Sequence, residues 1–208
     1  MKLAESTINQ FLDLTAGSDP VPGGGSISAL CGSVAAALTQ MVAQLTIGKK
    51  KYADVEDEMQ KVAAQAQLIR TKLTEYIDKD SEAYDKVFAA FKLPKETDEE
   101  KAIRSHQIQE STKWAATVPM EVAEAVYEMV PLIETVVKNG NTNAITDGCV
   151  AMMCARTAIL GALLNVRINL GSIKDQNFVD LYTDKAKRME REIKEIESEI
   201  LSHTYNSL

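Results

Sequence analysis

The residues of this chain that could do chemistry begin with a glycine triplet at a predicted helix start. Residues 20–26 read Pro-Val-Pro-Gly-Gly-Gly-Ser, so two prolines stiffen the approach to a backbone that a ligand can contact closely. We expect Ser26 to cap a helix of small side chains. Free N–H groups and a partial positive charge at a helix start would bind an anion, here through Gly23, Gly24, Gly25 and Ser26. The alternative is a tight turn leading into a closely packed helix.

Asp80 is the second candidate, because it interrupts an apolar helical seam. Residues 53–91 carry apolar side chains at steps of four and three, and Asp80 stands on that seam. An inward carboxylate needs either a partner or a chemical role, since burying it alone is costly. The sequence leaves both interpretations open.

The third candidate is the polar face of an apolar helix expected over residues 144–170. Asp147 and Asn165 are 18 positions apart, which is about five helical turns, and Asn169 follows about one turn later. Such a face either lines a cavity or forms a helix–helix contact that includes a hydrogen bond between polar side chains. A basic run follows the small-residue helix near Gly48 and consists of Lys49, Lys50 and Lys51. It is either a solvated group at the C-terminal end of the helix or a binding site for ligand carboxylates.

The elements that must position these residues are all helical. Apolar periodicity predicts helices over residues 4–16, 26–47, 53–91, 144–170 and 175–203. Another helix follows the capping box that starts at Thr97, and Pro119 and Pro131 should interrupt or kink its pattern. No strand signal occurs. We therefore expect one domain over residues 1–208, an all-α bundle of long antiparallel helices.

The length of the 53–91 pattern predicts a partner. As one helix it would span roughly 58 Å, whereas a compact domain of this size is not much wider than ~35 Å. The helix must break or lie along a second subunit, and we expect a homodimer.

Composition excludes several function classes. The net charge of −7 argues against nucleic-acid binding. Cys31, Cys149 and Cys154 suit reduced, buried thiols of a cytoplasmic protein. No His/Cys cluster has metal-ligand spacing, no secretory leader is evident, and polar residues interrupt 144–170, which favours a core helix over a membrane span. Carboxylate acid–base chemistry, with helix starts and lysines for anions, remains.

In order along the chain, these pieces resemble the formiminotetrahydrofolate cyclodeaminase / methenyltetrahydrofolate cyclohydrolase family. Arg104 and Glu124 also match family positions, without a role that the residues themselves suggest. Family members often carry arginine where this chain has Lys49 and Lys50, and lysine gives up bidentate carboxylate binding. The matching segments are Pro20–Ser26, Gly48–Lys50, Asp78–Tyr84, Leu93–Thr97, Val118–Pro119, Ala123–Glu124, Gly140–Asn141, Thr146–Asp147 and Gly161–Asn169.

The resemblance implies an all-α, homodimeric folate enzyme, here as a free-standing domain. Cyclodeamination, our first expectation, closes N10 of 5-formiminotetrahydrofolate onto the formimino carbon and releases ammonia. The alternative, cyclohydrolysis, adds water to 5,10-methenyltetrahydrofolate and gives 10-formyltetrahydrofolate. Both need proton transfers at one carbon between N5 and N10, so we expect no metal and no cofactor beyond the tetrahydrofolate substrate.

On this basis we expect Asp80 and Asp147 to be the catalytic pair. One would protonate the leaving group, and the other would stabilise the cationic carbon. Asn165 and Asn169 would hydrogen-bond the pterin ring. The glutamate tail, including a polyglutamate tail, is assigned to Gly23, Gly24, Gly25 and Ser26 with Lys49 and Lys50.

A different class of function stays open. The chain could be a helical dimer that binds folate or another anion without turning it over. An assay that follows the methenyl chromophore separates such a binding protein from an enzyme.

Overall fold

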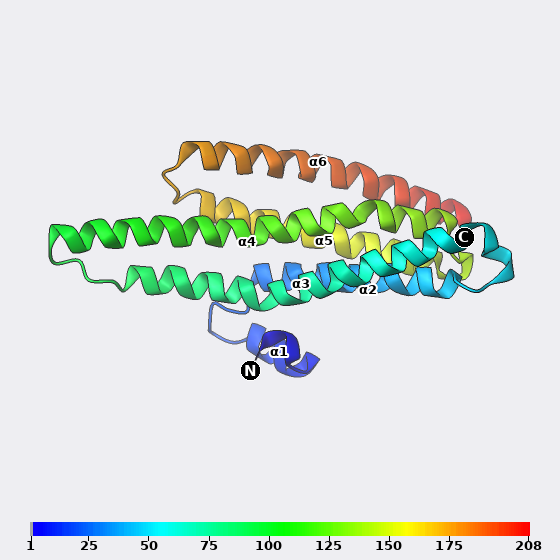
Figure 1. Cartoon of the computed structure of the whole chain (residues 1–208), viewed down its shortest axis with the longest axis horizontal. Helices are drawn as coiled ribbons and strands as arrows, with labels where there is room; N and C mark the ends of the chain where they lie inside the picture. The colour runs from blue at the N-terminus through cyan, green and yellow to red at the C-terminus, as the bar shows by residue number, and fades with distance from the viewer. Residues whose placement is uncertain (1) are drawn as a thin grey trace.

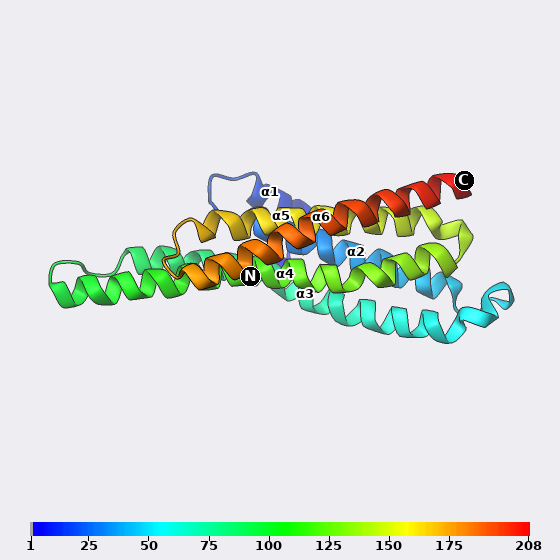
Figure 2. The same cartoon turned by 90° about the horizontal axis from the view of Figure 1, so that it is seen from above.

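Long helices dominate the chain from Gly24 onward, and they run side by side in one elongated bundle (Figures 1 and 2). The computed structural model describes residues 2–208, and no strand occurs in that range. The expected all-α bundle of long helices is confirmed. The helices are α1 (Ile8–Thr15), α2 (Gly24–Thr46), α3 (Glu56–Phe91), α4 (Asp98–Asn139), α5 (Ile145–Leu170) and α6 (Gln176–Ser207), with short 3-10 helices at Leu3–Glu5, Lys50–Val55 and Thr142–Ala144.

Small residues let α2 pack closely against its neighbours. A Cβ atom on Gly32 would lie 2.7 Å from Val126 on α4, and one on Gly161 of α5 would lie 2.5 Å from the hydroxyl of Ser28. Larger side chains at these positions would push the helices apart, because protein interiors leave no room for extra atoms. The close packing holds the start of α2 against α3 and α5, where the candidate residues lie.

The 36 residues of α3 form one continuous helix. The helix does not break, and within the single chain α2 and α4 run beside it because the bundle is itself elongated. A homodimer stays a prediction. The end of α3 and the start of α4 project beyond the ends of α5 and α6 (Figures 1 and 2). We call residues 84–111 the arm.

The α4 helix is continuous through Pro119 and Pro131, where we expected an interruption or a kink. Its start is the predicted capping box at Thr97. A proline lacks the N–H that would bond the carbonyl four residues earlier. Pro119 therefore leaves the carbonyl of Ala115 without its partner inside the helix.

Within the residues that the structure describes, two segments are long and apolar enough to qualify as membrane spans by length and composition alone. They are Gly24–Thr46 and Thr142–Leu170, and 56% and 50% of their apolar windows are buried inside the bundle. Partial burial between neighbouring helices is what the core-helix interpretation predicts.

Candidate functional site

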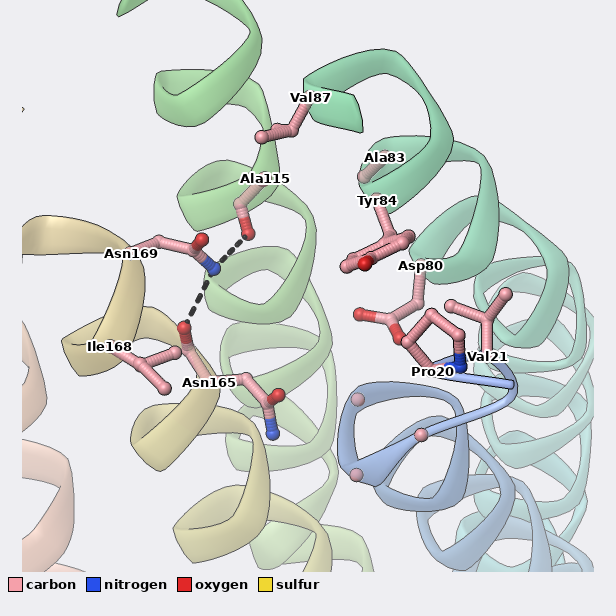
Figure 3. Close-up of a pocket in the computed structure, with 13 residues that line it drawn as sticks. Pro20, Val21, Asp80, Ala83, Tyr84, Val87, Ala115, Asn165, Ile168 and Asn169 are labelled. Carbon is pink, nitrogen blue, oxygen red and sulfur yellow. Dashed lines mark hydrogen bonds between the residues drawn. The ribbon is translucent and has the colours of Figure 1, made fainter. Parts of the chain in front are cut away.

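A pocket of about 310 Å³ opens where α2 begins and where α3, α4 and α5 pass each other (Figure 3). It combines the loop before α2, one carboxylate and two carboxamides with an apolar wall. Its lining residues are Pro20, Val21, Gly23, Gly24, Gly25, Asp80, Ala83, Tyr84, Val87, Ala115, Asn165, Ile168 and Asn169.

The carboxylate of Asp80 lies against the first turn of α2. The hydroxyl of Ser26 lies 3.3 Å from Asp80 Oδ2 and donates to the carbonyl of Ile77 at 2.8 Å, while the backbone N–H of Ser26 also bonds Asp80. A Cβ atom on Gly25 would lie only 2.0 Å from Asp80 Oδ1. Glycine at position 25 is therefore what lets this carboxylate reach the helix start.

Two expectations about this turn are corrected. Gly23, not Ser26, is the N-cap of α2, and it makes no side-chain capping bond. Ser26 is fully buried in the first turn and does not line the pocket. Asp80 accepts hydrogen bonds from Ser26, which we expected a bound anion to accept. Gly23, Gly24 and Gly25 do line the pocket, and their binding of an anion stays a prediction.

Burial raises the pKa of Asp80 above its usual range, and the hydrogen bonds from Ser26 lower it by less. A carboxyl with a raised pKa exchanges its proton closer to neutral pH than an exposed aspartate does. Asp80 is thus suited both to donate and to accept a proton in the pocket.

Two carboxamides face Asp80 from α5 across the pocket (Figure 3). Asn169 donates from Nδ2 to the carbonyl of Ala115 at 3.0 Å and to that of Asn165 at 2.9 Å. The Ala115 carbonyl is available because Pro119 supplies no N–H to it. Both N–H bonds of Asn169 are used, so its amide oxygen is left to accept a hydrogen bond from a ligand.

Asn165 is held in the same manner. Its Nδ2 donates to the carbonyl of Gly161 at 2.9 Å. One N–H and the amide oxygen remain for a ligand. Together the two side chains offer a ligand two amide oxygens as acceptors and one N–H of Asn165 as a donor.

Asp147 is not brought to this pocket. It lies half-buried in the first turn of α5, about 27 Å along the helix axis from Asn165 at 1.5 Å per residue. Two residues on one face of a helix point in the same direction, but they can lie far apart along the helix axis. Within one chain the expected Asp80–Asp147 pair therefore does not form, and a catalytic role of Asp147 stays a prediction.

Lys49 and Lys50 also lie at the far end of the bundle. They are exposed beyond the C-terminus of α2. There Lys51 reaches Thr142 at 3.4 Å, so the basic run is beside the turn that starts α5. In one chain these lysines and the glycine turn do not form a common clamp, because the whole of α2 separates them.

Several pocket residues were not identified from sequence. The sequence pattern assigned Tyr84 and Val87 to the apolar seam of α3, and it gave Ile168 no role. The carbonyl of Ala115 carries no signal in its own side chain. The proline four residues later was the available signal for it.

Across residues 2–208, no group of three or more His, Cys, Asp or Glu side chains is placed to hold a metal ion. The polar side chains that line the pocket are one carboxyl, two carboxamides and the phenol of Tyr84. Their chemistry is proton exchange and hydrogen bonding to a ring with donor and acceptor edges.

Known proteins resemble this chain along nearly all its length. The methenyltetrahydrofolate cyclohydrolase of Methylorubrum extorquens is 44% identical over 174 residues, 84% of this chain and 84% of that protein. The formimidoyltransferase-cyclodeaminase of Rattus norvegicus is 31% identical over 176 residues, 85% of this chain but 32% of that longer protein.

A solved structure shares the fold. The crystal structure of formiminotetrahydrofolate cyclodeaminase from Thermotoga maritima superposes with a TM-score of 0.89 at 29% identity, covering 99% of this chain and 98% of that one. A profile of the family described as Formiminotransferase-cyclodeaminase matches residues 7–188. On this match over most of its length, the chain belongs to the formiminotransferase-cyclodeaminase family.

Proposed function

We propose that this protein is an enzyme that works on the one-carbon bridge between N5 and N10 of tetrahydrofolate. The observation that carries the proposal is the pocket in which Asp80, with its raised pKa, faces the two oriented carboxamides of Asn165 and Asn169. The amides would hold the pterin edge. The carboxyl would then lie beside the atoms that gain and lose protons.

The reaction needs one group that can carry a proton in both directions. In cyclohydrolysis, water adds to the methenyl carbon and loses a proton to Asp80. The carbon–N5 bond then breaks as N5 takes that proton from Asp80. The hydroxyl group on the carbon loses its remaining proton to solvent, which leaves the formyl group on N10. In cyclodeamination, N10 adds to the formimino carbon and the protonated amino group leaves as ammonia. Neither route changes an oxidation state, so we propose that the substrate is sufficient without a further cofactor.

The identities favour cyclohydrolysis. The cyclohydrolase relative is 44% identical and covered over 84% of its length, whereas the cyclodeaminases above are 29–31% identical. Cyclodeamination, the first expectation from the sequence, is the second candidate, supported by the fold match to the Thermotoga maritima cyclodeaminase.

Absorbance of the methenyl group tests the proposal directly. We expect 5,10-methenyltetrahydrofolate to lose its absorbance faster with the protein than without it, and no ammonia to appear. Formation of the chromophore from 5-formiminotetrahydrofolate with equimolar ammonia would instead select cyclodeamination. If the protein binds folate but neither removes nor forms the methenyl absorbance, it is a non-catalytic binding protein and the proposal is wrong.

We further propose that the protein is a homodimer joined through α2 and α5. Apolar side chains of both helices lie exposed at spacings of three, four, seven or eleven residues, which keep to one face of a helix. This face ends at the pocket, where Ile168 is 77% exposed. A second copy packed there would cover the open side of the pocket. The residues of this exposed face are Val34, Met41, Leu45, Val150, Met153, Leu164 and Ile168.

A two-fold axis through the middle of this face would reverse the direction of the partner's helices. Asp147 of the partner subunit would then approach the pocket that contains Asp80. The basic run of the partner would approach the same pocket. A parallel arrangement would instead bring the two Asp147 carboxylates together, which is unfavourable for like charges. The antiparallel dimer is therefore the one that would unite the predicted catalytic pair.

Mixing two inactive variants tests this shared site. Asp80→Asn and Asp147→Asn homodimers should each be inactive, and subunit exchange should restore about a quarter of wild-type activity, because half the dimers are mixed and each has one intact site. Turnover is measured before and after exchange, with Asp78→Asn as the neighbouring-carboxylate control. Full activity of Asp147→Asn alone would contradict the shared site.

A further inference from the structure

The arm carries aromatic side chains that core packing does not explain. Tyr84, Phe88 and Phe91 on α3 are 40%, 51% and 52% exposed. The rings of Tyr84 and Phe88 stack with their centroids 6.3 Å apart and an interplanar angle of 14°. We call these three side chains the aromatic row. Exposed apolar side chains that lie side by side occur at ligand-binding sites and at protein interfaces.

The aromatic row begins inside the pocket. Tyr84 is a lining residue one turn after Asp80, and Figure 3 shows its ring projecting into the pocket beside that carboxylate. From Asp80 to Phe91 the helix rises about 16 Å. The row is therefore a continuation of the proposed active site along the arm rather than a separate patch.

Cations accompany the aromatic row. The Lys92 ammonium lies 4.0 Å from the ring centroid of Phe88, and the Arg104 guanidinium lies 5.6 Å from that of Phe91. Arg104 is also fixed in place, since its Nε and Nη2 donate to the carbonyl of Phe91 at 3.3 and 3.1 Å. Of the ion pairs found within residues 2–208, none includes Lys92 or Arg104. Both charges are available to carboxylates of a ligand.

We propose that the arm binds the aryl-glutamate half of the folate substrate. The p-aminobenzoyl ring stacks on the aromatic row, and the glutamate carboxylates, including those of a polyglutamate tail, meet Lys92 and Arg104. This assignment rests on the proposed function. A ligand that carries a pterin, then a benzoyl ring, then carboxylates matches the order of pocket, aromatic row and cations. Lys49 and Lys50 of the same chain lie too far away for this task.

Two double variants test the assignment with the full chain. Phe88→Ser/Phe91→Ser should raise the KM for methenyltetrahydrofolate about tenfold, or about 1.4 kcal/mol, with kcat nearly unchanged. In the wild type the pentaglutamate substrate should have the lower KM, and Lys92→Gln/Arg104→Gln should remove that advantage.

Matched controls come from the same protein. Ile103→Ser replaces an equally exposed apolar residue of the arm that lines a different pocket, with Ala89 and Ala90, and it should behave as the wild type. Lys187→Gln/Lys194→Gln replaces two exposed lysines of α6 and should leave the pentaglutamate advantage intact. If Lys49→Gln/Lys50→Gln abolishes the advantage while the arm variants keep it, the tail lies at the basic run and the assignment is wrong.

A fragment separates this assignment from the proposed reaction. Calorimetric titration with p-aminobenzoyl-pentaglutamate should show binding to the wild type and none to either arm variant, whether or not the protein turns folates over. Absence of wild-type binding would overturn the assignment even if turnover is observed. Light scattering on the arm variants closes the remaining alternative, because dissociation into smaller species would mean that the aromatic row contacts a second copy.

Discussion

Replacing Asp80 with asparagine is expected to reduce kcat by about 10²–10⁴-fold, the range that a positioned acid–base group contributes. Asparagine keeps an oxygen that accepts the hydrogen bonds of Ser26, so the start of α2 should stay in place. It cannot carry a proton between substrate atoms. Turnover of methenyltetrahydrofolate under saturating substrate measures the effect.

The same variant should be more stable than the wild type at neutral pH. The raised pKa of Asp80 means that the folded protein holds this proton more tightly than the unfolded chain, so stability falls as pH rises through the folded pKa. Asparagine removes that cost. We expect a higher Tm for Asp80→Asn at pH 7 and a difference that narrows toward pH 4. A folded Asp80→Asn protein with wild-type kcat would show that the proposed acid–base role is wrong.

Gly25→Ala should inactivate the enzyme without unfolding it. The new Cβ would lie 2.0 Å from Asp80 Oδ1, and the group that must move is the mobile end of a side chain rather than backbone. The carboxyl would leave its position against α2. A displacement of about 1 Å in a catalytic group can cost on the order of 10²-fold in rate. Steady-state kinetics and circular dichroism together measure both parts of the expectation.

Gly24→Ala is the matched control for this steric effect. Its Cβ would meet Asn165 Nδ2 at 3.2 Å, a contact that a small adjustment relieves, so the loss should be smaller and appear mainly in KM. The double variant Gly25→Ala/Asp80→Asn should be no worse than the poorer single variant, because both changes remove the same group. Additive losses would mean that Gly25 acts independently of Asp80.

Features encoded locally were predictable from the sequence. The capping box at Thr97 and the positive φ of Gly48 mark helix ends with their own side chains or backbone. Asp80 was identifiable because a carboxylate on an apolar seam is a local anomaly. Asn165 and Asn169 followed from the 3.6-residue period of α5, and the pocket brings both to Asp80.

What depends on position along a helix axis was not predictable. Periodicity assigned Asp147 and Asn165 to one face, but the pocket lies at only one end of that face. The seam of α3 was expected to be buried throughout. Tyr84 and Phe91 on this seam are exposed instead, because the end of α3 extends beyond α5 and α6, where α4 runs beside it.

Pro119 lies outside the pocket, but it determines which hydrogen-bond acceptor is available to Asn169 inside it. Every amino acid at position 115 would bring a carbonyl oxygen, so no substitution there removes the acceptor that Asn169 uses. An N–H-bearing residue at 119 would compete for that oxygen and weaken one of the two hydrogen bonds that orient the Asn169 amide. The orientation of the Asn169 amide in the pocket therefore depends on Pro119, one helical turn from Ala115. Pro119 does not line the pocket, so a search for ligand-contacting residues would miss it.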